Sequence, residues 1–197
     1  MSEDVELQPA MDAKGLSFFK NQISKSKCFI EYGCGGSTYH AAMIAKVPNI
    51  ISVDTSKLWV DKVKRSLSNS GSHLDLFHCD VGEIGNWGTP INGDRHKHFW
   101  RYMVHPWTQA KKLSLEPDLV LVDGRFRVAS CLYSLVAAKE GTLIMFDDYL
   151  DRKKYAVVED FCQIKEVHGR MAVFCVDKKY AVDEIVAAIA QNSVLFG

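Results

Sequence analysis

Glu31-Tyr32-Gly33-Cys34-Gly35-Gly36-Ser37-Thr38 is the stretch of this 197-residue chain that decides its fold. It follows the apolar run 28–32, which predicts a short strand, and leads into residues 37–46, which predict a helix with Ser37 as its N-cap. Glycines at such a turn let the backbone bend tightly and approach a ligand closely, and the helix start offers unpaired N–H groups to an anion. The sequence therefore predicts a ligand-binding loop after the first strand.

Strand and helix patterns alternate along the rest of the chain. The run 119–122 is continuously apolar, which is typical of a parallel strand buried on both faces. We predict one α/β domain (1–197): a doubly wound, mostly parallel, seven-stranded Rossmann-like sheet that ends in an antiparallel hairpin. It would have an N-terminal helical segment (1–26), an irregular insert (81–112) and a helical tail (178–197). Strands are expected at 28–32, 49–54, 73–79, 118–123, 142–146, 164–168 and 171–176, and helices at 12–25, 57–67, after 123, near 152–162 and at 182–190.

The composition excludes several classes of partner. The 24 Lys and Arg residues balance the 24 Asp and Glu residues, so no global field attracts nucleic acid or anionic lipid. The apolar stretches are too short to cross a bilayer, and the acidic start 1–6 lacks the pattern of a secretory signal. Six cysteines stand singly in apolar segments, which is typical of buried thiols in a reducing compartment. We expect a cytoplasmic protein that binds neither nucleic acid nor a membrane.

Polar residues near the loop indicate which ligand it binds. Asp54 ends the second strand, 21 residues after Gly33, the distance at which a carboxylate accepts hydrogen bonds from ribose hydroxyls. Glu31 could face a ligand ammonium, and the helix start could receive a carboxylate. A dinucleotide fingerprint requires a glycine where Thr38 stands, so pyrophosphate binding is disfavoured. An amino acid joined to a nucleoside suggests S-adenosylmethionine.

Two further groups could contact the adenine of this ligand. Asp80, followed by Val81, ends the third strand and could accept the adenine amino group, while Trp59 could pack on the adenine face. Asp54 and Trp59 also have purely structural interpretations. Asp54 can cap the next helix, and Trp59 on an apolar helix face can belong to the core.

The loop resembles motif I of the class I S-adenosylmethionine-dependent methyltransferases. The resemblance covers roughly residues 12–177. The chain is similar in particular to small bacterial methyltransferase-like proteins, which have segments that resemble residues 86–88, 122–128 and 146–149 of this sequence. It implies S-adenosylmethionine as methyl donor and a small-molecule acceptor that the sequence does not identify. It also implies the donor-binding residues Glu31, Gly33, Gly35, Gly36, Ser37, Thr38, Asp54, Trp59, Asp80 and Val81.

Three carboxylates follow the fourth and fifth strands. Asp123, Asp147 and Asp148 would meet at one edge of the sheet, where their repulsion could be relieved by Mg²⁺. The arrangement resembles the metal-dependent catechol and sugar O-methyltransferases, which implies these three residues as metal ligands and Asp123 as a candidate base. The catechol enzymes have a lysine three residues after the first Asp, whereas Phe126 stands here.

Two arginines flank this phenylalanine. Arg125 and Arg127 could hold an anionic acceptor such as a carboxylate or phosphate. Alternatively, either arginine could simply pair with Asp147 or Asp148, and Asp123 could cap the following helix.

The insert 81–112 is rich in aromatic and histidine residues, which favours an acceptor wall over a disordered loop. His98 or His105 is an alternative to Asp123 as the general base. Exposed aromatics would equally suit the interface of a homo-oligomer. Three functions stay open at this point: a metal-assisted O-methyltransferase, a metal-independent methyltransferase with a histidine base, and a catalytically silent protein that binds the donor and acts in regulation or assembly.

Overall fold

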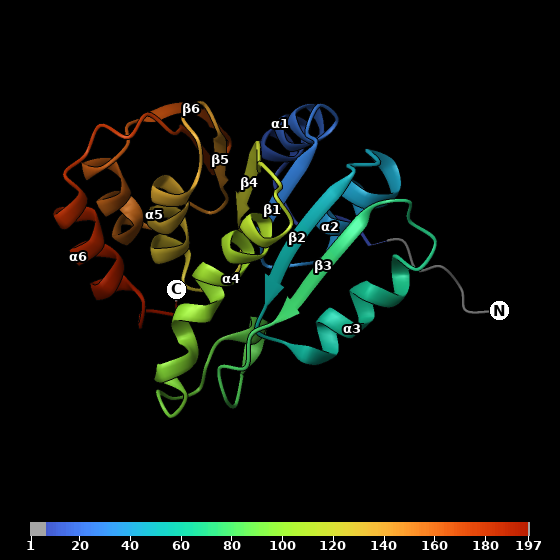
Figure 1. Cartoon of the computed structure of the whole chain (residues 1–197), viewed down its shortest axis with the longest axis horizontal. Coiled ribbons are helices and arrows are strands. Elements are labelled where there is room, and N and C mark those ends of the chain that lie inside the picture. The colour runs from blue at the N-terminus through green and yellow to red at the C-terminus, as the bar shows by residue number, and fades with distance from the viewer. Residues whose placement is uncertain (1–6, 197) are drawn as a thin grey trace.

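The computed structural model describes residues 7–196, so the acidic start 1–6 lies outside the described residues. Within that range, seven strands form one sheet in the order β3-β2-β1-β4-β5-β7-β6 (Figure 1). Strands β1 to β5 are parallel, and β7 pairs antiparallel with both β5 and β6. The predicted α/β sheet with a C-terminal hairpin is confirmed. The strands are β1 Cys28–Tyr32, β2 Asn49–Asp54, β3 His73–His78, β4 Leu119–Val122, β5 Leu143–Phe146, β6 Ile164–His168 and β7 Met171–Cys175.

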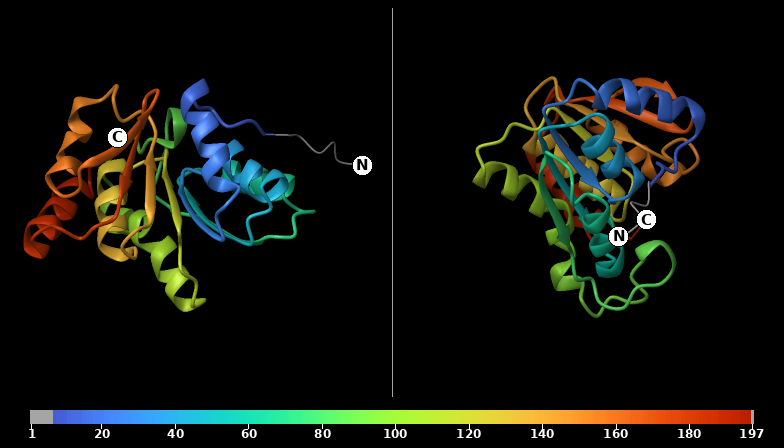
Figure 2. Two further views of the ribbon diagram at one scale, coloured as in Figure 1. Left: turned by 90° about the horizontal axis from the view of Figure 1, so that it is seen from above. Right: turned by 90° about the vertical axis from the view of Figure 1, so that its right-hand side faces the viewer.

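Helices cover both faces of the sheet, as two views at right angles show (Figure 2). One layer holds α1, α2 and α3, and the other holds α4, α5, η3 and α6. The helices are α1 Ala13–Ile23, α2 Gly36–Tyr39 with its π-helical continuation η1 His40–Ile44, α3 Lys57–Ser66, α4 His96–Lys112, α5 Arg127–Ala137 and α6 Val182–Asn192, with 3₁₀ turns η2 Asn86–Gly88 and η3 Lys153–Asp160.

The alternation of side chains along β1 decides what the ligand loop contacts. Ile30 and Tyr32 pack with the α4 and α5 layer, whereas Phe29 packs with the α1 and α3 layer. Successive side chains of a strand point to opposite faces. Glu31 therefore points to the same face as Phe29, where its neighbour in register on β2 is Ser52.

The structure corrects the prediction that 81–112 is irregular throughout. Residues 96–112 form the 17-residue helix α4, although Pro106 lies inside it. A proline in a helix interior removes a hydrogen bond and costs about 3 kcal/mol, and we attribute its tolerance here to the burial of Phe99, Tyr102 and Trp107. The part before α4 extends beyond the carboxyl ends of β2 and β3 (Figure 1).

Three smaller predictions also need comment. The helix expected near 152–162 is the 3₁₀ helix η3, and α2 begins at Gly36 with Gly35 as its N-cap, so Ser37 is not the cap. All six cysteines are free, and five of them are buried. Among residues 7–196, no helix has both the length and the apolar character needed to span a bilayer.

Candidate active site

The glycine loop is in backbone contact with the loop that follows β4. Gly33 has a φ of +98° and donates to the carbonyl of Val53 over 2.8 Å. A Cβ at Gly33 would lie 2.7 Å from the Cα of Gly124, too close for any side chain. Glycine is therefore required at position 33 both by its dihedral angle and by the approach of the two loops.

Glu31, near the end of β1, holds the glycine loop through its side chain. Its carboxylate is fully buried and accepts hydrogen bonds from the hydroxyls of Ser37, Thr38 (2.5 Å) and Ser52 (2.8 Å). Burial raises the pKa of Glu31 to about 7, and the three hydroxyls partly oppose this effect. Both oxygens are occupied by groups of the chain itself. These bonds disfavour a direct contact of Glu31 with a ligand ammonium, which stays a prediction, and they show that Glu31 holds the loop.

The loop has two further supports. Trp59 donates from Nε1 to the carbonyl of Cys34 over 2.6 Å, and its ring lies beside Gly35. Gly36 lies directly against the backbone of Gln8, since a Cβ at position 36 would overlap the carbonyl of that residue. Trp59 is thus placed to position the loop, whereas its predicted contact with adenine stays a prediction.

Asp54 lies half-buried at the end of β2, next to the glycine loop. Its Oδ1 accepts from the backbone N–H of Ser56 over 2.8 Å, and burial raises its pKa to about 6. The following Thr55 donates to the carbonyl of Gly88 over 2.6 Å, which anchors the segment before α4 to the end of β2. A carboxylate in this place is well situated to accept hydrogen bonds from the hydroxyls of a ribose.

The two residues predicted after β3 lie in different environments. Asp80 is exposed, accepts from the N–H of Gly82 over 3.0 Å and lies 3.6 Å from a guanidinium nitrogen of Arg95. These contacts leave its role toward adenine a prediction. The side chain of Val81 is only 1% exposed and packs in the core with Phe99, so only its backbone could reach a ligand.

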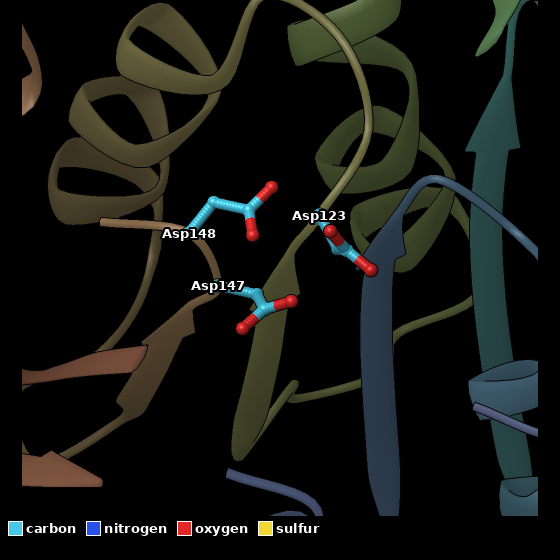
Figure 3. A group of neighbouring side chains, drawn as sticks. All are labelled: Asp123, Asp147 and Asp148. Atoms are coloured by element: carbon cyan, nitrogen blue, oxygen red, sulfur yellow. The ribbon is translucent and has the colours of Figure 1, made fainter. Parts of the chain in front are cut away.

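Asp123, Asp147 and Asp148 gather at the ends of β4 and β5, as the sequence predicts (Figure 3). One oxygen from each carboxylate lies within 4.8 Å of the others, a spacing that a cation could bridge. Asp147 has no exposed surface, and Asp148 has a φ of +57°. The parallel register of β4 and β5 brings these three residues together although they are 24 and 25 positions apart.

Each of the three carboxylates is nevertheless paired with an arginine. Nη2 of Arg127 lies 3.1 Å from Oδ1 of Asp123, and its Nη1 lies 3.0 Å from Oδ2 of Asp148. Nη2 of Arg152 lies 3.3 Å from the same Oδ2 of Asp148. Nη2 of Arg170 lies 2.7 Å from Oδ2 of Asp147, and its Nε lies 2.8 Å from Oδ1 of Asp148. The premise of three uncompensated carboxylates is therefore wrong, because three guanidinium groups match their charge. The structural alternative, pairing of Arg127 with Asp148, is what the structure contains.

Asp123 combines this pairing with a position at the edge of the sheet. Its side chain keeps 24% of its surface exposed, and one oxygen contacts Arg127. Burial raises its pKa to about 7, Arg127 opposes this effect, and the neighbouring Asp147 adds to it. Such a carboxylate can exchange a proton near neutral pH.

The two histidines lie in different places. His105 stacks on Phe77 with ring centroids 3.6 Å apart, and its Nε2 lies 4.0 Å from Asp75, which is three residues before the end of β3. This position away from the strand ends disfavours His105 as a base. His98 lies in the first turn of α4, half-buried near Asp80, and stays a candidate.

The sequence interpretation missed Arg152 and Arg170. Arg170 follows Gly169 in the turn between β6 and β7, and only the insertion of β7 beside β5 brings it to Asp147. The one local signal was the glycine turn itself, because nothing in the spacing joins positions 147 and 170.

The order of the seven strands and the glycine loop after β1 are those of the Rossmann-like methyltransferase fold. A methyltransferase-like protein from Silicibacter pomeroyi superposes with a TM-score of 0.84 at 24% identity, covering 96% of this chain and 98% of that chain. Cofactor-bound Rv0187 from MTB superposes with a TM-score of 0.55 at 13% identity, covering 85% and 81% of the two chains. No protein-family model and no curated protein matches this chain. The similarity establishes the fold.

Proposed function

We propose that the protein is an S-adenosylmethionine-dependent methyltransferase that methylates an oxygen of a small molecule. The observation that carries this proposal is the placement of the glycine loop beside Asp54 at adjacent strand ends. The loop is closed against Gly124 and held by Glu31, so it offers backbone groups at a fixed place. This combination of groups is suited to a nucleoside that carries an amino-acid end.

Asp54, the glycine loop and Asp123 have different roles in this reaction. When bound, S-adenosylmethionine supplies a methyl group to a nucleophile. Asp54 accepts hydrogen bonds from the ribose hydroxyls, and the loop 33–36 holds the methionyl end. Asp123 takes the proton of the acceptor hydroxyl, because it is the carboxylate at the end of β4 whose side chain stays partly exposed.

A resident divalent metal fits the cluster in distance but not in charge. The three carboxylate oxygens lie close enough together for one ion. However, Arg127, Arg152 and Arg170 already neutralise the carboxylates, and a cation would have to displace at least one guanidinium. We therefore propose that methyl transfer requires no metal.

Titration calorimetry with S-adenosylmethionine and S-adenosylhomocysteine tests donor binding. Heat of binding with both compounds supports the proposal, and absence of heat with correctly folded protein contradicts it. A screen of hydroxyl acceptors for formation of S-adenosylhomocysteine then tests turnover. Tight donor binding without turnover on any acceptor would favour the catalytically silent alternative, and loss of turnover on His98→Ala but not on Asp123→Asn would favour the histidine base.

A further inference from the structure

Four arginines lie around the carboxyl ends of β4 and β5, and one of them differs from the rest. Arg127, Arg152 and Arg170 are each ion-paired with an aspartate. Arg125 makes no ion pair within residues 7–196, although it is only two positions from Asp123. The two arginines that the sequence leaves as equivalent candidates for holding an anion are therefore not equivalent.

Arg127 has no capacity left for a ligand. Its side chain is 4% exposed and donates to the carbonyls of Gly124, Asp147 and Asp123 in addition to its two carboxylate partners. A guanidinium has five N–H donors, and these contacts occupy all three of its nitrogens. Arg127 is a structural part of the cluster.

Arg125 has the opposite character. Its side chain is half-buried, and one terminal nitrogen donates to the hydroxyl of Thr89 over 3.3 Å. Among the described residues 7–196, its buried Nε has no hydrogen-bond partner. A guanidinium stays charged at any physiological pH, so burial does not remove its need for an anion. Within residues 7–196, the guanidinium of Arg125 is thus held in place without the carboxylate or phosphate that its N–H groups are suited to bind.

The location of Arg125 connects it with the proposed reaction. Its backbone N–H donates to the Tyr102 hydroxyl over 3.1 Å, which fixes the loop after Asp123. Its side chain reaches toward Thr89 in the segment before α4, and Thr55 anchors that segment to the end of β2. The unpaired cation therefore lies between the ends of β2 and β4, close enough to Asp54 to oppose the rise that burial causes in the pKa of that carboxyl, and its side chain donates to the segment before α4.

We propose that Arg125 binds a carboxylate or phosphate group of the methyl acceptor, so that the acceptor is an anionic small molecule. This inference rests on the proposed function, since it assumes a methyl acceptor at this edge of the sheet. The α-carboxylate of the donor is the other source of the same chemistry. The experiment below separates the two sources.

The test is titration calorimetry of the full chain loaded with S-adenosylhomocysteine, with benzoate and inorganic phosphate as anionic probes and benzyl alcohol as the neutral probe. We expect at least one anion to bind the wild-type protein. Arg125→Gln should weaken that binding at least about tenfold, and Arg125→Lys should weaken it less because the charge remains. The control Arg65→Gln removes an exposed arginine of α3 and should leave anion binding unchanged.

The outcomes distinguish this inference from the proposed function. If neither anion binds the wild-type protein, or if Arg125→Gln binds them as tightly as the wild type, the inference is overturned. If Arg125→Gln loses affinity for S-adenosylhomocysteine but not for 5′-methylthioadenosine, which lacks a carboxylate, Arg125 binds the donor and the acceptor assignment is wrong. If the wild type binds no S-adenosylhomocysteine, the proposed function fails, and the anion titration of the unloaded chain still tests Arg125.

Discussion

Nη2 of Arg170 lies 2.7 Å from Oδ2 of Asp147, a carboxylate without any exposed surface. The same guanidinium contacts Asp148 and donates to the carbonyl of Ala10, so it also ties the cluster to the segment before α1. Removal of one partner from a buried ion pair leaves an uncompensated charge, which destabilises a fold more than the intact pair stabilises it. Arg170 should therefore matter to the stability of the whole domain.

The first prediction concerns this pair. Arg170→Met should lower the free energy of unfolding by about 2–4 kcal/mol, because Asp147 would be left buried and charged. Urea denaturation followed by circular dichroism measures the change. The double variant Arg170→Met/Asp147→Asn should recover part of the loss, and Arg101→Met should have little effect. Equal stabilities for Arg170→Met and the wild type would show that the pair does not hold the cluster.

The sequence predicts the fold well because periodicity reports burial directly. The continuous apolar run of β4 and the glycine loop after β1 are local signals, and their consequences are determined by parallel pairing. Helix α4 escaped prediction since Pro106 normally ends a helix, and the burial of Tyr102 and Trp107 that permits it is a tertiary effect.

The sequence predicts which carboxylates gather in the candidate site, but it does not predict the arginines that pair with them. Asp123, Asp147 and Asp148 meet because their strands are neighbours, which the alternation of elements indicates. Their partner Arg170 comes from the hairpin turn, and its approach depends on the insertion of β7 between β5 and β6. No sequence spacing encodes that contact, so the arginines that pair with the three carboxylates could not be predicted.

The second prediction is a pH dependence of stability caused by Glu31. The folded state raises the pKa of Glu31 from 4.5 to about 7, so the folded protein holds a proton that the unfolded chain has lost between these pH values. This contribution to stability is complete below pH 4.5 and is lost as the pH rises through 7. From pH 5 to pH 8 the wild type should lose on the order of 1–3 kcal/mol more than Glu31→Gln.

Denaturation curves of both proteins at several pH values measure this difference. Asp54 and Asp123 also have raised pKa values and are common to both proteins, so the difference between the two profiles reports Glu31 together with its repulsion by Asp123. The exposed control Glu184→Gln should follow the wild type. Parallel pH profiles for the wild type and Glu31→Gln would contradict the buried, proton-holding carboxylate.

The third prediction concerns the contact between the glycine loop and the loop after β4. Gly33→Ala should lower the free energy of unfolding by about 1–3 kcal/mol and weaken donor binding, because the new Cβ meets Gly124 at a positive φ. Gly71→Ala is the matched control, since a Cβ there meets nothing within 4 Å. Melting temperatures and donor titrations check both variants. A Gly33→Ala protein as stable as Gly71→Ala would mean that the two loops are not held together.

The fourth prediction tests the ribose contact. Asp54→Ala should weaken binding of S-adenosylhomocysteine by about 1–3 kcal/mol, because the ribose hydroxyls lose a charged acceptor. Calorimetry on the variant, with the exposed Asp183→Ala as control, measures the loss. Unchanged affinity on Asp54→Ala would reject the assignment while leaving the fold untouched.

The last prediction concerns metal. Because three guanidinium groups match three carboxylates, Mg²⁺ or Mn²⁺ at millimolar concentration should not raise the melting temperature of the wild type, and a chelator should not lower its methyl transfer. Arg170→Met removes one of the cations that occupy Asp147 and Asp148, so the same ions should now stabilise the variant, by about 1–2 kcal/mol at a concentration near ten times the dissociation constant. The contrast between the two proteins is the informative quantity, because a weak, nonspecific ion effect would act on both alike. Stabilisation of the wild type by Mg²⁺, or loss of its activity on chelation, would show that the cluster exchanges arginine for metal when it works.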